Sequence, residues 1–247
     1  MPPTLQFPTL TFPSLESLPS DSAVRQVYPD DTYPNDIYGR GYSEAPTEIL
    51  SNNDYITQLA LLLQFIAWTS TYVVGMSMGG GITAAFTSTF PHLVNGKIVL
   101  LASAGIVGLP VNENGERTMP SLSKQLTPGQ SGEPELVAAN PGLRELQASS
   151  LPGYSRILQD SMRYGPIAGL SNAFEALATT QTANGPLKVL VVHGTNDSIV
   201  PYTEAAKIKA LVPQAEVVTV EGADHSFLGH PDHWPIVTSN TVRFLSA

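Results

Sequence analysis

Short apolar runs alternate with helical segments along most of this chain of 247 residues. Continuous apolar runs at 97–102 and 187–192 are typical of strands that are covered on both faces. Shorter strand patterns lie at 72–74 and 216–220, and helical patterns lie at 54–68, 78–90, after Pro201 and at 236–245. This alternation predicts an α/β fold with a mostly parallel sheet flanked by helices.

The length predicts one domain, and the texture of the chain divides it into three parts. Residues 1–35 are proline-rich and without a clean period, so we expect them to be poorly ordered. The α/β core is expected over 36–105 and 186–247. Between these ranges, 106–185 holds short amphipathic pieces separated by breaks at Pro141, Pro152 and Gly165, which predict a helical cap or lid inserted after the second strand of this region.

Composition excludes several classes of function. The chain has 12 basic and 21 acidic residues, a net charge of −9, which argues against nucleic acid as a partner. Cysteine is absent, so disulfides, thiolate nucleophiles and cysteine-ligated metals are ruled out. The N-terminus lacks a signal-peptide pattern, and no apolar stretch approaches the roughly 20 residues that span a bilayer. We therefore expect no membrane span and a cytoplasmic location.

The sequence Gly75-Met76-Ser77-Met78-Gly79 lies at the end of an apolar strand and the start of a helix. It matches the G-x-S-x-G elbow, in which a serine nucleophile occupies a strained turn and small residues two positions away let strand and helix approach closely. The string alone is weak evidence, but its strand-turn-helix context strengthens it. Ser77 could otherwise be an ordinary helix N-cap.

A serine needs a base to remove its proton and an acid to orient that base. Asp197 follows the strand at 187–192, and His225 follows the strand at 216–220. The order Ser, Asp, His, each on a loop after a strand, is that of α/β hydrolases. Asp197 could instead cap the next helix, and Asp224 competes with it as the acid.

Two other patterns suggest different chemistry. His230 and His233, with Asp224 and Asp232, form a small cluster that could be a metal site, but the spacing matches no metal motif. The glycines at 79–81 match part of a dinucleotide-binding pattern, but no acidic residue stands about 20 positions later to hold a ribose. We therefore predict neither a metal nor a cofactor.

The chain resembles the α/β-hydrolase superfamily, in its lidded serine esterase and lipase-like branch. The resemblance covers residues 36 to 247 and includes the turn Asp36-Ile37-Tyr38-Gly39-Arg40-Gly41-Tyr42-Ser43, which is similar to the D-x-x-G-x-G-x-S loop of that branch. It implies that Ser77 is the nucleophile, His225 the general base and then acid, and Asp197 the orienting carboxylate. It also implies an oxyanion hole with the backbone N–H of Met78 as one donor.

One departure from the family concerns the second oxyanion donor. The family draws it from an early loop, usually marked by His-Gly, and this chain has no His-Gly before Ser77. Only 35 residues precede the turn at 36–43, so we expect the early strands to be missing or reduced, and the second donor is not identified.

Three hypotheses of function follow. The first is a serine hydrolase that cleaves small to medium, moderately apolar carboxylic esters through an acyl-enzyme on Ser77. The alternative is a catalytically impaired homologue that only binds a small apolar ligand. A third possibility keeps the triad but transfers the acyl group to peroxide or an alcohol. The sequence leaves the oligomeric state open.

Overall fold

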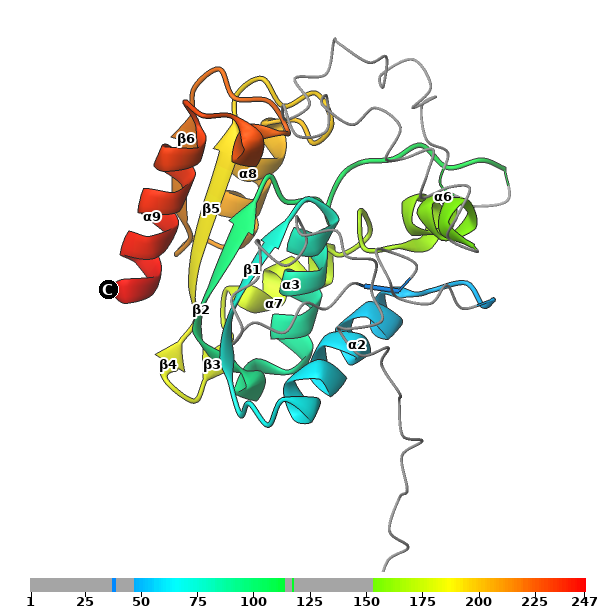
Figure 1. Ribbon diagram of the computed structural model, residues 1–247, viewed down its shortest axis with the longest axis horizontal. Helices are drawn as coiled ribbons and strands as arrows, with labels where there is room; N and C mark the ends of the chain where they lie inside the picture. The colour runs from blue at the N-terminus through cyan, green and yellow to red at the C-terminus, as the bar shows by residue number, and fades with distance from the viewer. Residues whose placement is uncertain (1–36, 39–46, 114–116, 118–152) are drawn as a thin grey trace, which may run out of the picture. The chain divides into compact units, whose positions relative to one another are not determined.

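The computed structural model describes residues 37–38, 47–113, 117 and 153–247 (Figure 1). The proline-rich segment 1–35, most of the turn at 36–43 and much of the expected cap lie outside these residues. The expectations for these parts, including missing or reduced early strands, therefore stay predictions.

Four parallel strands form the main sheet, in the order β1-β2-β5-β6 (Figure 1). They are β1 (Thr71–Met76), β2 (Val94–Leu101), β5 (Lys188–Gly194) and β6 (Glu216–Val220). A separate hairpin joins β3 (Gln181–Thr182) to β4 (Gly185–Pro186). Because the four main strands are parallel, their carboxyl ends share one edge of the sheet, where α/β proteins place their ligands.

Helices pack against both faces of this sheet and confirm the predicted α/β architecture. The helical elements are α2 (Asn52–Phe65), α3 (Met78–Thr89), η2 (Pro91–Leu93), α6 (Tyr154–Tyr164), α7 (Ser171–Leu177), α8 (Thr203–Leu211), η4 (Phe227–Gly229) and α9 (Trp234–Ser246). Helices α2, α3, α6, α7 and α8 contribute to one core cluster, whereas η4 and α9 contribute to the other. None of the helices in the described ranges is long and apolar enough to cross a membrane.

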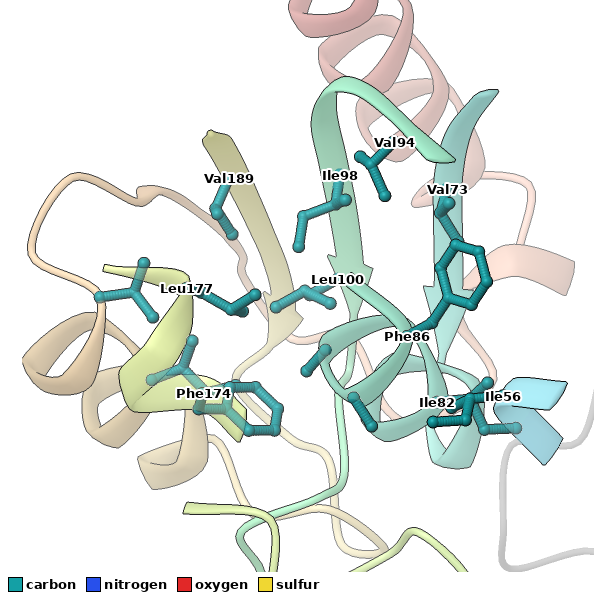
Figure 2. Packing of buried hydrophobic residues seen from close by; sticks show 14 of the residues in the cluster. Ile56, Val73, Ile82, Phe86, Val94, Ile98, Leu100, Phe174, Leu177 and Val189 are labelled. Carbon is teal, nitrogen blue, oxygen red and sulfur yellow. The ribbon is translucent and has the colours of Figure 1, made fainter. Parts of the chain in front are cut away.

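Strand β2 shows how the two cores share the sheet. Ile98 and Leu100 belong to the first cluster, which also holds Phe86 and Leu177 (Figure 2). Val99 and Leu101 point the other way and join the second cluster. Successive side chains of a strand face opposite sides, so a run that is apolar throughout is buried on both.

Two helices within the range expected to form a cap pack in the same core as the sheet. Phe174 and Leu177 of α7 are fully buried in the first cluster (Figure 2). Ile157 of α6 is fully buried in the same cluster. One turn further along the same face of α6, the buried hydroxyl of Ser161 lies 2.9 Å from that of Tyr55 in α2. No break in packing therefore marks a boundary at residue 185, and the division into core and cap stays a prediction.

Candidate active site

Ser77 stands alone between the last residue of β1 and the first residue of α3. Its backbone has φ 53° and ψ −121°, a conformation that residues with a Cβ rarely adopt. Strain of this kind persists only where the surrounding structure holds it, and it is found at active sites. The predicted strand-turn-helix context of the elbow is confirmed.

The end of β2 holds the backbone of Ser77 in place. The N–H of Ser77 donates to the carbonyl of Leu101 at 2.9 Å, and the N–H of Ala104 donates to the carbonyl of Ser77 at 2.9 Å. Ala102, between these two contacts, also has a positive φ, of 42°. Two residues with positive φ therefore directly follow the neighbouring strands β1 and β2, at the carboxyl edge of the sheet.

The expectation that small residues are needed two positions on either side of Ser77 is correct for Gly75 but not for Gly79. A Cβ on Gly75 would lie 2.1 Å from the carbonyl oxygen of Gly79, so this glycine is required, as expected. A Cβ on Gly79 would meet no described atom within 4 Å beyond its chain neighbours and its own helix backbone. At Gly80 and Gly81, in contrast, a Cβ would lie 2.2 Å from Ser103 Oγ and 2.0 Å from the carbonyl of Pro166.

Within α3, the need for a small residue thus falls on positions 80 and 81 and not on position 79. The same packing explains two of the three glycines in the partial dinucleotide pattern at 79–81. At Gly80 and Gly81, other atoms of the protein occupy the space that a Cβ would need.

Met78 is the first residue of α3. The first N–H groups of a helix have no acceptor within it, and they favour negative charge. The backbone N–H of Met78 therefore stands directly after Ser77 as a donor, which suits the oxyanion role expected of it.

Asp197 and His225 are hydrogen-bonded to each other. His225 Nδ1 lies 2.8 Å from Asp197 Oδ2, and the side chain of Asp197 is completely buried. The other oxygen, Oδ1, accepts the N–H groups of Ile199 at 2.9 Å and Val200 at 2.8 Å. Both carboxylate oxygens thus have partners, and the imidazole is held through one ring nitrogen, as a general base requires.

The environment of Asp197 keeps its carboxyl ionised. Burial by itself raises its pKa, but the side chains of His193 and His225 and the N–H of Val200 together hold that pKa well below its usual range. A carboxylate of this kind can orient an imidazole and stabilise the positive charge that the imidazole gains during catalysis.

Asp224 does not face the imidazole of His225 in this way. Its Oδ1 accepts the N–H of Ser226 at 2.8 Å and closes a local turn. The geometry therefore pairs His225 with Asp197, although Asp224 is adjacent in the chain.

The cluster around His230 and His233 is a surface feature. The two rings stack with centroids 4.4 Å apart, and the Asp232 side chain is 85% exposed at 3.9 Å from His230 Nδ1. Across the described ranges, no three His, Asp or Glu side chains come together as a metal site would need.

In the described part of the chain, Ser77 and His225 form no hydrogen bond with each other. Catalytic hydrogen bonds in ligand-free enzymes are often long and tighten only with substrate. The elbow does meet the loop after β5 through apolar side chains. Met78 packs against a buried cluster of Ala104, Ile167 and Val200. This cluster joins the elbow to the loop that carries Asp197.

Sequence reasoning missed His193, a buried residue of β5 whose Nε2 lies 3.5 Å from Asp197 Oδ2. The signal was present, since a histidine that continues a buried apolar strand needs partners inside the protein.

A family model described as alpha/beta hydrolase fold matches residues 35–231. The chain belongs to this family. Among its relatives, 2-hydroxymuconate semialdehyde hydrolase of Pseudomonas sp. (strain CF600) is 29% identical over 219 residues, which are 84% of this chain and 71% of the relative.

Two solved structures share the fold. The enol-lactonase of Burkholderia xenovorans LB400 has a TM-score of 0.64 and 17% identity, over 85% of this chain and 78% of its own. The meta-cleavage product hydrolase of Pseudomonas fluorescens IP01 has a TM-score of 0.62 and 17% identity, over the same shares of the two chains. These two structures support the fold. The family match and the relative named as a hydrolase support a hydrolase of the α/β fold.

Proposed function

We propose that the protein is a serine hydrolase that cleaves carboxylic esters through an acyl-enzyme on Ser77. The observation that carries the proposal is the strained backbone of Ser77 at the carboxyl end of β1. The hydrogen-bonded pair of Asp197 and His225 stands at the same edge of the sheet and supports it.

The reaction would proceed in two halves. Ser77 Oγ attacks the ester carbonyl while His225 Nε2 takes its proton, and the N–H of Met78 stabilises the oxyanion. The intermediate collapses to the acyl-enzyme as His225 returns the proton to the leaving alcohol. Water then attacks the acyl carbon, gives its proton to His225, and releases the carboxylic acid as Ser77 regains a proton.

The surroundings of Ser77 favour an apolar acyl group. Ala104, Ile167 and Val200 are buried beside Met78, with partly buried Met162 and two further apolar residues packed against them. This apolar neighbourhood supports a small to medium, moderately apolar acyl chain as the substrate group, because ligand sites are lined chiefly by apolar side chains.

A fluorophosphonate probe tests the nucleophile. We expect the wild-type protein to be labelled and to turn over p-nitrophenyl esters, and Ser77→Ala to do neither. Ser239→Ala is the matched control, because Ser239 is exposed on α9 and its hydroxyl bonds to the carbonyl of Ile236 in its own helix. A folded wild-type protein that resists the probe would exclude the proposal.

A second candidate substrate comes from the names of two relatives. Two proteins from Pseudomonas, 29% and 28% identical to this chain, are named 2-hydroxymuconate semialdehyde hydrolase. Turnover of that compound, lost in Ser77→Ala, would favour this substrate over simple esters.

The same tests on the wild-type protein distinguish two alternatives to ester hydrolysis. A catalytically impaired homologue would unfold cooperatively and yet resist the probe. An enzyme that transfers the acyl group to peroxide or an alcohol would be labelled, but its products would be peracids or new esters instead of the free acid.

A further inference from the structure

His193 in β5 is a completely buried histidine that the proposed reaction does not use. It stands four residues before Asp197 in the chain, in the strand that leads to the acid loop. A polar ring at this depth requires partners, and those it has lie in that loop.

The ring of His193 contacts both Asp197 and Val200, and Val200 in turn contacts Asp197. His193 Nε2 lies 2.9 Å from the carbonyl oxygen of Val200 and 3.5 Å from Asp197 Oδ2. The N–H of Val200 in turn donates to Asp197 Oδ1 at 2.8 Å. Val200, whose N–H supports one carboxylate oxygen, is therefore held through its own carbonyl by His193, and the same ring nitrogen faces the other oxygen.

The proton of His193 is assigned by its surroundings. Nδ1 is buried and has no hydrogen-bond partner among the described residues. A proton there would be a buried donor without an acceptor, whereas Nε2 has the carbonyl of Val200. The ring therefore donates through Nε2, chiefly to that carbonyl, which is the nearer acceptor.

The ring is also held from the side. Tyr202 meets it edge-on, with ring centroids 5.9 Å apart and an angle of 83°. The Tyr202 hydroxyl lies 2.6 Å from the hydroxyl of Thr219, the β6 residue that pairs with His193 across the sheet. His193 is thus fixed between the sheet and the start of α8.

We propose that His193 is a positioning residue for the acid of the triad. Its Nε2–H holds the loop from Asp197 to Val200 so that Oδ1 stays on the backbone and Oδ2 stays directed at His225. Its effect on rate rests on the proposed function, but its effect on the Asp197–His225 hydrogen bond does not.

Two nearly isosteric variants separate donor from volume. Glutamine can place an amide donor near the position of Nε2, whereas methionine has similar length and no donor. We expect His193→Gln to keep most of the wild-type kcat for p-nitrophenyl esters. We expect His193→Met to lower kcat by about 10- to 100-fold with little change in KM, because misplacement of a catalytic group by even 1 Å has effects of this size.

A spectroscopic readout makes the test independent of activity. The proton between His225 Nδ1 and Asp197 Oδ2 should give a downfield ¹H resonance that Asp197→Asn removes. We expect His193→Gln to keep this resonance and His193→Met to shift or lose it, at comparable melting temperatures. If the wild-type protein neither hydrolyses esters nor reacts with the probe, the proposed function fails, and the resonance still decides the positioning role.

The proposal is overturned if His193→Met keeps both the resonance and the rate, or if His193→Gln loses as much as His193→Met. Should the methionine variant not fold, His193→Asn replaces it. The asparagine amide ends near the position of Nδ1 and does not reach the Val200 carbonyl, so this variant should lose the resonance and the rate as well.

Discussion

His225 Nδ1 lies 2.8 Å from Asp197 Oδ2, although 28 positions separate the two residues in the chain. They stand on loops after β5 and β6, which are neighbours in the sheet and pair in parallel. Parallel neighbours end at the same edge, so the topology alone brings the two loops together. The backbone N–H groups that grip Oδ1 leave Oδ2 free for the imidazole.

This hydrogen bond predicts a large effect of Asp197→Asn on catalysis. The amide can no longer fix the tautomer of His225, and we expect kcat for ester hydrolysis to fall by about 10⁴-fold. Asp224→Asn is the matched control, because Asp224 bonds to the N–H of Ser226 and not to the imidazole. Steady-state assays of both variants check the assignment, and an equal loss in the control would contradict it.

The same carboxyl should make stability depend on pH. Burial alone raises the pKa of Asp197, but the side chains of His193 and His225 hold it well below its usual range. In the unfolded chain the pKa of an aspartate is about 3.9. A depressed pKa stabilises the fold fully above the unfolded value, and this stabilisation is lost as the pH falls through the folded value.

Urea unfolding at a series of pH values from neutral downward measures this effect. We expect the free energy of unfolding of the wild-type protein to exceed that of Asp197→Asn most at neutral pH. The difference should shrink once the pH falls below about 4. A difference that stayed constant or grew toward acid pH would show that the carboxylate does not stabilise the fold in this way.

The strain at Ser77 predicts that function costs stability. Glycine adopts φ 53° with little penalty, whereas strained backbone costs of order 1–3 kcal/mol in other residues. Part of the gain is offset by the freedom of glycine in the unfolded chain. We expect Ser77→Gly to be more stable than Ser77→Ala by about 1 kcal/mol in urea unfolding, with both unreactive toward the probe. Equal stability would mean that the elbow is not strained.

Much of the fold could be predicted because apolar runs report burial directly. The strand expected at 216–220 is β6 with the same bounds. The strand expected at 97–102 begins earlier in the structure, at Val94. This start could not be predicted because Asn95 and Gly96 resemble a turn in the sequence, and Gly96 has a φ of 75°. Likewise, β5 continues through His193 and Gly194, which end the apolar pattern but not the strand.

For the candidate site, only the chain order of its residues and the edge of the sheet on which they lie could be predicted. The order Ser, Asp, His and the shared edge follow from strand positions, so residues 77, 197 and 225 could be chosen from the sequence. The contact between His193 and the carbonyl of Val200 depends on how the loop from 197 to 200 folds back, which no periodicity records. The reason for Gly80 and Gly81 depends on Ser103 and Pro166, which are distant in the chain.

The three consecutive glycines of α3 allow that packing to be measured. Gly79 and Gly81 lie in the same helix, so alanine at either position gains roughly 0.5–1 kcal/mol of helix propensity. Gly79→Ala meets no described atom within 4 Å outside its chain neighbours and helix backbone, so it should be neutral or stabilising. At Gly81 the Cβ would lie 2.0 Å from a backbone carbonyl, which cannot move as a side chain can, so Gly81→Ala should destabilise by about 1–3 kcal/mol. Urea unfolding of the two variants measures the contrast, and changes of the same sign and size would show that the Pro166 carbonyl does not restrict α3.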